Sequence, residues 1–469
     1  MAAEDQRKTG LQGEPGPADE PGQHGTPGRR GTSGKAGKAG KAGRTDGPGT
    51  VGAPAATGAL SSLRNSPPFR RLWVSNLFFF CGTWTQTLIL GWLVFESTHS
   101  EMLLAVFTAA RLAPMLLGPF AGVLSDRLDR VRLLTFACSW ALVAVATVAT
   151  MESFFHVPYW ALVLGGLAIG LAQSPSQPAR FALVLDLVGR ESLSNANALN
   201  AMAMNMTQVL GPAIGGAMIS AVGAPIALWI STAWYGISLI ALWPLRHQAR
   251  RTPHSSPRER PESVGRMLTE GLRTVLTNRL AAGVLFVTLA ANILLWPVYQ
   301  GFMPVFADEV LHLDAAGLGW LLTCSGAGGL AGSLIIAGLG DFRAKGGLFV
   351  IGTATWAALW ALFSLSHHTA LSFVLMACIG LTSATFGVLQ STLLLMVTEP
   401  SVQGRALGIQ ELAIGVMPLA SLVLGAAAQQ FGVGTTTFVS AVLLVVFLSV
   451  LALRLPQLLR YSGRGDSQA

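Results

Sequence analysis

Charged residues are scarce in this sequence. They make up 12% of its 469 residues, while hydrophobic residues make up 51%. A soluble domain usually carries about 25% charged residues. This shortage argues against a large soluble enzyme and predicts a chain that is embedded in a lipid bilayer.

The sequence also has little that would build a reactive centre. Its four cysteines stand singly inside apolar runs, without the spacing of a metal site or a disulfide framework, at Cys81, Cys138, Cys324 and Cys378. No H-E-x-x-H motif, phosphate-binding loop or nucleophile elbow occurs. We therefore expect no enzyme activity, no catalytic residue, no metal and no cofactor, and we expect the cysteines to pack as small apolar side chains.

An apolar core typical of a cleaved signal peptide is missing from the first residues. Residues 1–68 are instead rich in Gly, Pro, Lys and Asp, and they include the low-complexity run Gly34–Ala42. Such a segment has too little apolar surface to offset the entropy of ordering. We predict a disordered basic cytoplasmic tail over 1–68, with weak attraction to anionic lipid head groups as the alternative role.

Long apolar runs are abundant beyond this tail. About 20 apolar residues in a helix cross a hydrocarbon core of roughly 30 Å, and in lipid a helix satisfies its own backbone polar groups. The runs predict an all-α membrane protein with twelve spans near 72–95, 102–124, 132–151, 158–183, 195–221, 224–245, 281–306, 315–340, 346–366, 370–397, 405–430 and 435–455.

Basic residues give a check on this segmentation, because short cytoplasmic loops retain Lys and Arg. All of the 31 Lys and Arg residues except Arg111 fall in the tails, or in loops and helix ends on one side of the twelve spans. This distribution predicts that both termini are cytoplasmic. It also explains the net charge of +8 by membrane topology, so we expect no nucleic-acid partner.

The longest interior basic loop divides the spans into two groups of six. The predicted domains are an N-terminal six-helix bundle, a cytoplasmic linker, a C-terminal six-helix bundle and a cytoplasmic tail, over 69–245, 246–279, 280–455 and 456–469. Within the linker, apolar residues recur at helical spacing at Val264, Met267, Leu268, Leu272, Val275 and Leu276. This spacing predicts an amphipathic helix at the membrane surface.

Several stretches carry a family resemblance. Gly122-Val123-Leu124-Ser125-Asp126-Arg127-Leu128-Asp129-Arg130 resembles motif A of the major facilitator superfamily, with Asp129 where the motif usually has Gly. Gly211-Pro212-Ala213-Ile214-Gly215-Gly216 resembles the Gly-Pro antiporter motif of drug exporters in that superfamily. Phe69-Arg70-Arg71-Leu72-Trp73 and Pro178-Ala179-Arg180 are similar to its enterobactin-exporter branch.

This resemblance covers about residues 69–455. It implies the major facilitator fold, with twelve transmembrane helices in two six-helix pseudo-symmetric halves. Parallel repeats of this kind rock around a central site in alternating access. The resemblance therefore implies a multi-pass secondary active transporter of the cytoplasmic (inner) membrane, which we expect to be a monomer.

The resemblance also implies a cytoplasmic gate at motif A. In the family, the Asp of the motif meets the exposed N–H groups at the start of span eleven, and its last Arg pairs with an acid below span four. Carried to this sequence, Asp126 meets the start of the helix near Gly404, and Arg130 pairs with Asp186. The gate set is Gly122, Asp126, Arg127, Arg130, Asp186 and Arg405. Ordinary topology charge is the alternative role.

The Gly-Pro motif suits a hinge in span five, at Gly211, Pro212, Gly215 and Gly216. Pro212 removes one backbone hydrogen bond and permits a kink. Gly215 and Gly216 allow another helix to approach closely. A purely packing role is the alternative.

Polar residues form stripes on single faces of spans one, four, seven and ten, and the stripe of span four comprises Gln173, Gln177 and Arg180. Inside a bilayer such a face must meet protein or water, and by resemblance these four spans line the central cavity. The candidate substrate residues are Asn76, Thr83, Thr87, Gln173, Gln177, Asn292, Trp296, Gln300 and Gln390. Hydrogen bonding between helices without ligand contact is the alternative for each of them.

Two charged residues inside spans stand apart. Arg111 lies about 22 Å along span two from Asp126, where a charge is costly and usually functional. It is a candidate for binding an anionic group of a substrate, or for a structural ion pair. Glu411, about two turns into span eleven, is the best candidate for proton coupling, with a local packing role near Arg405 as the alternative.

The sequence thus favours a proton-coupled exporter of amphipathic, drug- or siderophore-like small molecules. An importer of a small metabolite on the same fold is the alternative, because a fold does not fix a function. A non-transporting membrane sensor is the alternative of another class.

Overall fold

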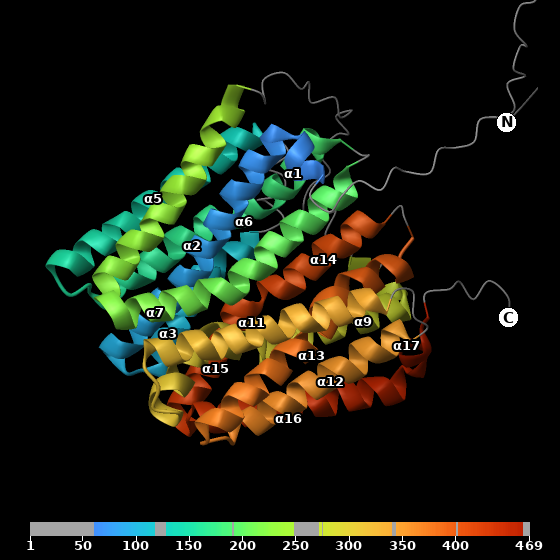
Figure 1. Cartoon of the computed structure of the whole chain (residues 1–469). Coiled ribbons are helices and arrows are strands. Elements are labelled where there is room, and N and C mark those ends of the chain that lie inside the picture. Colours follow the sequence, from blue (N-terminus) through green and yellow to red (C-terminus); the bar gives the residue numbers. More distant parts are fainter. Residues whose placement is uncertain are drawn as a thin grey trace, which may run out of the picture. The chain divides into compact units, whose positions relative to one another are not determined.

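The computed structural model describes residues 61–117, 128–189, 192–247, 272–273, 275–339, 344–399 and 402–462. The chain divides into two units, Met1–Ala56 and Thr57–Ala469, and every described residue belongs to the second. Over these residues every regular element is a helix (Figure 1), as the sequence predicts. Most of the tail predicted for 1–68 and most of the amphipathic linker helix lie outside the described residues.

The first helices run from α1 to α7. α1 (Ser61–Asn65) lies inside the range that the sequence predicts as a disordered tail. Ser66 then caps α2 (Pro67–Thr98) by accepting a hydrogen bond from the backbone N–H of Phe69, and Pro67 suits the first helical position because it has no N–H to satisfy. The elements that follow are α3 (Glu101–Leu112), the 3-10 turn η1 (Ala113–Leu117), α5 (Arg130–Phe154), α6 (Tyr159–Val188), α7 (Leu193–Leu242) and the 3-10 turn η2 (Trp243–His247).

α7 is 50 residues long and is broken at Gly223. This residue has φ +81° and ψ +163°, a backbone conformation that glycine adopts without steric cost and other residues adopt with strain. The break lies between the spans that the sequence predicts over 195–221 and 224–245. α7 therefore consists of two helices that turn sharply at one glycine.

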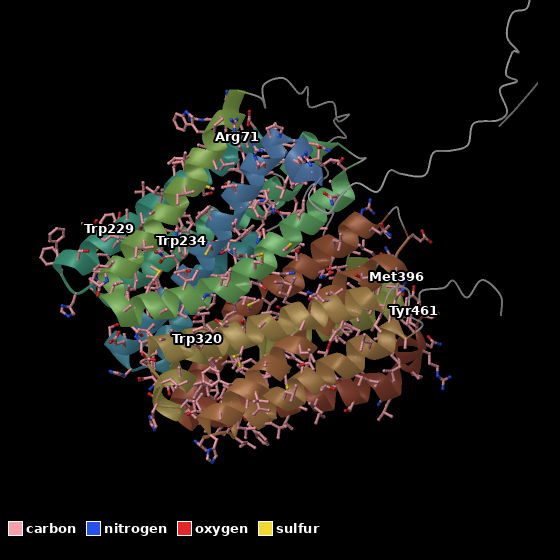
Figure 2. All side chains as sticks on the ribbon, viewed as in Figure 1. Arg71, Trp229, Trp234, Trp320, Met396 and Tyr461 are labelled. Atoms are coloured by element: carbon pink, nitrogen blue, oxygen red, sulfur yellow. The ribbon has the colours of Figure 1, made fainter. Side chains whose placement is uncertain are left out.

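The later helices begin with α9 (Arg279–Leu294), which is continued by two π-helical segments. The remaining elements are η4 (Val298–Phe302, π-helical), α10 (Met303–Val305), η5 (Phe306–Val310, π-helical), α11 (Ala315–Gly338), α12 (Lys345–Ser364), α13 (Thr369–Val397), α14 (Gln403–Gly415), α15 (Met417–Phe431), α16 (Val433–Arg454) and α17 (Pro456–Arg460). Pi-helical turns are rare in proteins, and those that occur often lie at functional sites. The Tyr461 hydroxyl donates to the Met396 carbonyl (3.0 Å), which ties the residue after α17 to the end of α13 (Figure 2).

Nine helices among the described residues are long and apolar enough to cross a membrane. One of them, Asn195–Arg246, includes the break at Gly223. Large apolar side chains such as Ile240 and Leu453 are mostly exposed, as they must be on faces that meet lipid. The chain is therefore a multi-pass membrane protein, and the exact number of twelve spans stays a prediction.

The most extensive helix contacts join α2 to α7 and α11 to α13. We call α2 to α7 the N-terminal helices and α9 to α17 the C-terminal helices. α2 and α5 pack on α7, and α5 packs on α6; α11 and α12 pack on α13, and α12 packs on α16. The two sets meet where α7 contacts α11 and where α3 contacts α15 (Figure 1).

The break in α7 gives a first testable prediction. Gly223→Ala forces a side chain into a backbone conformation that costs about 1–3 kcal/mol, so we expect a lower thermal midpoint for the detergent-solubilised protein. Gly387→Ala is the matched control, because Gly387 is helical and its added methyl group meets no neighbour within 4 Å. That control should gain about 0.5–1 kcal/mol. Equal midpoints for the two variants would contradict the strained turn.

Candidate functional site

Arg111 on α3 is the centre of a polar site between the two sets of helices. Its side chain is buried, with 6% exposure. Its guanidinium donates from Nη1 to Thr87 Oγ1 on α2 (2.9 Å) and from Nη2 to Gln300 Oε1 on η4 (3.1 Å). The hydrogen bonds of one side chain therefore link an N-terminal helix to the π-helical segment of the C-terminal set.

The site lacks a negative charge among the described residues. The ion pairs in this part of the chain are Arg130–Asp186 and Arg132–Asp129, and neither contains Arg111. The buried Nε atom of Arg111 also has no hydrogen-bond partner there. A guanidinium inside a membrane protein is thus held by two neutral oxygens, one from a hydroxyl and one from an amide.

Small residues bring the neighbouring elements close to Arg111. A Cβ atom added to Gly170 on α6 would collide with the Arg111 carbonyl oxygen, and one added to Gly301 on η4 would press on Thr108, one turn before Arg111. Glycines at such contacts let backbones approach closely in membrane proteins. α6 and η4 therefore pack directly on α3 and fix the depth of the guanidinium.

Aromatic rings from the C-terminal helices lie within one helical turn of Gln300. Trp296 and Tyr299 are half-buried, and their ring centroids are 5.7 Å apart in an edge-to-face arrangement. The Trp296 ring is further supported by Trp356 (5.9 Å) and Phe386 (6.4 Å), which stack on each other. Such contacts add about 0.5–1.5 kcal/mol per pair beyond burial, so these rings form a rigid wall.

A second buried arginine belongs to the polar stripe that the sequence predicts on span four. Arg180 on α6 has 1% exposure and donates to Asn76 Oδ1, Ser75 Oγ (3.3 Å) and Cys138 Sγ (3.3 Å). Its guanidinium carbon lies 4.2 Å from the Phe79 ring centroid, a cation–π contact. The sequence counts this arginine with the basic helix ends, and its spacing of three and seven residues from Gln177 and Gln173 also places it on the polar face of span four.

The predicted substrate residues fall into different environments. Thr87, Arg111 and Gln300 are brought together, whereas Asn76 donates to Asn200 Oδ1 (2.6 Å) beside Arg180, within the N-terminal helices. Thr83 and Asn292 donate to backbone carbonyls of their own helices, those of Phe79 and Thr288. Half-buried side chains are found at Gln173, Gln177, Trp296 and Gln390. The candidates thus do not converge on one site.

The glycines of the Gly-Pro motif pack on two different helices. Added Cβ atoms at Gly211 and Gly215 would press on α2 at Trp84 and Thr85, and Thr85 donates to the Gly211 carbonyl (2.8 Å). A Cβ atom at Gly216 would collide with α11, at the carbonyl of Ala315 and at Gly319. Gly319 in turn approaches the Pro212 carbonyl. The motif therefore lies where α2, α7 and α11 cross, and the hinge stays a prediction.

The gate is described only in part. Gly122, Asp126 and Arg127 lie outside the described residues. Arg130 Nη1 meets Asp186 Oδ2 at 2.5 Å and also donates to the Ala182 carbonyl (3.3 Å), so the structure contains the pair that the resemblance implies.

Asp129, which departs from motif A, accepts a hydrogen bond from the backbone N–H of Arg132 (3.0 Å) and caps α5. Arg405 and Glu411 both lie on α14. Arg405 is half-buried and Glu411 is exposed. Nothing in these positions tests their roles in gating and coupling, which stay predictions.

An apolar groove of about 680 Å³ lies between α9, α15 and α16. Its lining includes Leu419, Val423 and Leu443, which are mostly exposed on the lipid-facing side. The lining contains no charged residue and little polar surface, so it suits acyl chains rather than a charged ligand. The polar site at Arg111, rather than this groove, is the candidate functional site.

Comparison with known proteins places the chain among transporters. A family model described as transmembrane secretion effector matches residues 57–462. The staphyloferrin A transporter of Staphylococcus aureus is 24% identical over 373 residues, which are 77% of this chain and 90% of that protein. The multidrug efflux pump Tap of Mycobacterium tuberculosis is 26% identical over 78% of this chain and 88% of its own. The enterobactin exporter EntS of Shigella boydii is 26% identical over 75% and 82%.

Solved structures show the same fold. The nucleoside transporter NupG superposes with a TM-score of 0.61 at 16% identity, covering 84% of this chain and 99% of its own. A POT family transporter in complex with a thioalcohol-conjugated peptide superposes with a TM-score of 0.68 at 9% identity, covering 83% and 96%. The family model and the sequence relatives confirm the predicted resemblance to major facilitator transporters, and the solved structures show the fold.

The Arg180 cluster gives a second prediction. Arg180→Lys keeps the charge, but one ammonium group cannot donate to Asn76 and Ser75 while a planar cation lies on Phe79. We expect a loss of about 1–3 kcal/mol from the unpaired buried groups, measured as a lower thermal midpoint. Arg279→Lys, at the exposed first residue of α9, should leave the midpoint unchanged. A stable Arg180→Lys protein would show that the forked geometry is dispensable.

Proposed function

The chain belongs to the transmembrane secretion effector family, and from this premise we propose that it is a proton-coupled exporter of amphipathic, drug- or siderophore-like small molecules. It is a major facilitator transporter, and the proteins that it matches by sequence are named as a transporter of staphyloferrin A, a multidrug efflux pump and an exporter of enterobactin. Direction, coupling ion and substrate class are the parts that we propose.

The observation that carries the proposal is the hydrogen-bonded contact of Arg111 with Thr87 and Gln300. A buried charge within the membrane is costly and is retained where it binds or moves something. Its two partners come from helices before and after the predicted linker. Relative motion of these helices would change the surroundings of the guanidinium, as alternating access requires.

We propose twelve spans in two six-helix halves, with both termini cytoplasmic, in a monomer of the inner membrane. Contacts between the N- and C-terminal helices support a state that is closed at one end. Ser100 donates to Gln429 Oε1 (2.8 Å), and Ser220 donates to Asp314 Oδ2 (3.0 Å). These residues adjoin loops that contain no Lys or Arg, so they belong to the outer end in the proposed topology. The residues of the proposed site all come from one chain, and for this reason we propose a monomer.

We further propose that motif A forms the inner gate. Arg130 and Asp186 hold α5 and α6 together, and Asp126 would meet the start of α14 near Arg405 when the inner end closes. Glu411, on the same helix α14, is the proposed proton-carrying group. Motion of α14 would then link closure of the gate to the protonation of this carboxyl.

Efflux from proteoliposomes tests this function. Vesicles are loaded with a panel of amphipathic compounds at neutral pH and diluted into acidic buffer. An antiporter in either orientation exchanges entering protons for leaving substrate, so we expect efflux that stops when a protonophore removes the gradient. Glu411→Gln should lose the gradient-driven efflux and keep substrate exchange, whereas Glu399→Gln, exposed beyond the end of α13, should behave as the unmodified protein.

The same vesicles separate the alternatives. Uptake from the acidic side would identify a proton symporter, which is the importer alternative. Absence of flux under every gradient would identify a non-transporting protein such as a sensor.

The gate gives a separate prediction. The Arg130–Asp186 pair is partly exposed, with 22% and 30% of each side chain accessible, and such pairs contribute about 0.2–1 kcal/mol. Asp186→Asn should therefore leave a folded protein in the membrane but abolish transport. Asp126→Asn, at the other acid of the proposed gate, should have the same effect. Exchanging the two charges, Arg130→Asp with Asp186→Arg, should recover part of the flux. Arg132→Gln removes a looser pair and serves as the control. Full transport by well-expressed Asp186→Asn protein would remove the pair from the gate.

A further inference from the structure

We propose, on the basis of the function above, that the transported compound is an organic anion with a flat aromatic body. Its anionic group takes the place of Gln300 on the Arg111 guanidinium, and its body lies against Trp296 and Tyr299. The site thereby selects compounds by charge and by shape together. Gln300 holds the arginine while no substrate is bound.

The missing counter-charge argues for an anion. Both hydrogen-bond acceptors at Arg111 are neutral, and the described residues supply it with no carboxylate. A buried charge without a partner of opposite sign keeps its full desolvation cost. An anionic oxygen accepts hydrogen bonds about twice as strongly as a neutral amide. Exchange of the Gln300 oxygen for a carboxylate is therefore favourable.

The surroundings of Gln300 argue that a ligand can reach the site. Gln300, Tyr299 and Trp296 are half-buried, although the rings behind them, Trp356 and Phe386, are buried. All three half-buried residues lie on or beside the π-helical segment η4, whose widened turn is typical of functional sites. Gln300, Tyr299 and Trp296 therefore have free surface that a ligand can contact, and the packed rings of Trp356 and Phe386 support them from behind.

The aromatic rings around Trp296 determine what shape of ligand body fits the site. Trp296 is held by three other rings, so it presents its remaining surface in a fixed orientation. A flat ring system gains from offset stacking or edge contact with such a surface. An apolar body in this place also lowers the local dielectric constant and strengthens the hydrogen bonds to Arg111.

Arg180 does not offer a second site of this kind. Its Nη atoms donate to Ser75, Asn76 and Cys138, its guanidinium lies on Phe79, and only its Nε atom has no partner among the described residues. At 1% exposure it is enclosed by these residues of the N-terminal helices and presents no free surface to a ligand. Charge selection is therefore assigned to Arg111 alone.

Binding of three matched probes to the protein in nanodiscs tests the proposal. Naphthoate, naphthamide and naphthylmethylammonium share one ring system and differ in charge. We expect naphthoate to bind at least ten-fold more tightly than the other two, and Arg111→Gln to lose this preference. Trp296→Leu should weaken naphthoate and naphthamide alike and keep the ratio between them.

Gln300→Glu gives the sharpest variant, because it keeps Arg111 and supplies an internal carboxylate. We expect this variant to fold and to bind naphthoate at least ten-fold more weakly, with a smaller effect on naphthamide. Gln430→Glu adds the same charge at an exposed position near the end of α15 and should change neither affinity. A purely structural bridge between Arg111 and Gln300 would leave naphthoate binding unchanged in the glutamate variant, and that result would overturn the proposal.

The outcomes for substrate class and for transport are distinct. Equal binding of the three probes, together with proton-driven efflux of other compounds, would overturn the anion site and leave the exporter standing. Arg111-dependent binding of naphthoate without flux under any gradient would support the site and overturn the exporter.

Discussion

A guanidinium inside a lipid bilayer must be hydrogen-bonded, and this requirement organises the region around Arg111. Two consecutive helices and one element far away in sequence have to meet for the requirement to be fulfilled: α3 carries the cation, α2 supplies Thr87 and η4 supplies Gln300. Gly170 leaves room for the Arg111 carbonyl, and Gly301 leaves room for the Thr108 side chain. The position of one charge thus constrains the packing of helices from both ends of the chain.

Features that depend on local rules could be predicted from the sequence. Apolar runs located the helices, and the chain turns at Gly223, between two predicted spans, because only glycine adopts that backbone conformation freely. The pairing of Arg130 with Asp186 followed from a motif whose spacing is tied to one turn between helices. Asp129 is unusual for the motif, yet it is an ordinary helix cap.

Features that depend on how helix faces meet could not be predicted in this way. A polar stripe indicates that a face avoids lipid, but it does not say which neighbour it meets. Asn292 and Gln300 stand on the same stretch of chain, yet the first bonds to its own helix and the second reaches Arg111. Arg180 stands both at the basic end of span four and on its polar face, and neither position indicates that its guanidinium meets Asn76 and Phe79. The two π-helical segments have no sequence signature that composition or periodicity reveals.

At Gly216 and Gly319 the contact between α7 and α11 is made by backbone atoms, because these two residues present no side chains there. Interlocked side chains hold two helices at one angle, because a change of tilt must lift each knob out of its hole. A bare contact between glycines has no knobs to lift. Around Gly216 and Gly319, α7 and α11 are thus in close contact without an interlocked side chain of either residue to oppose a change in the angle between them.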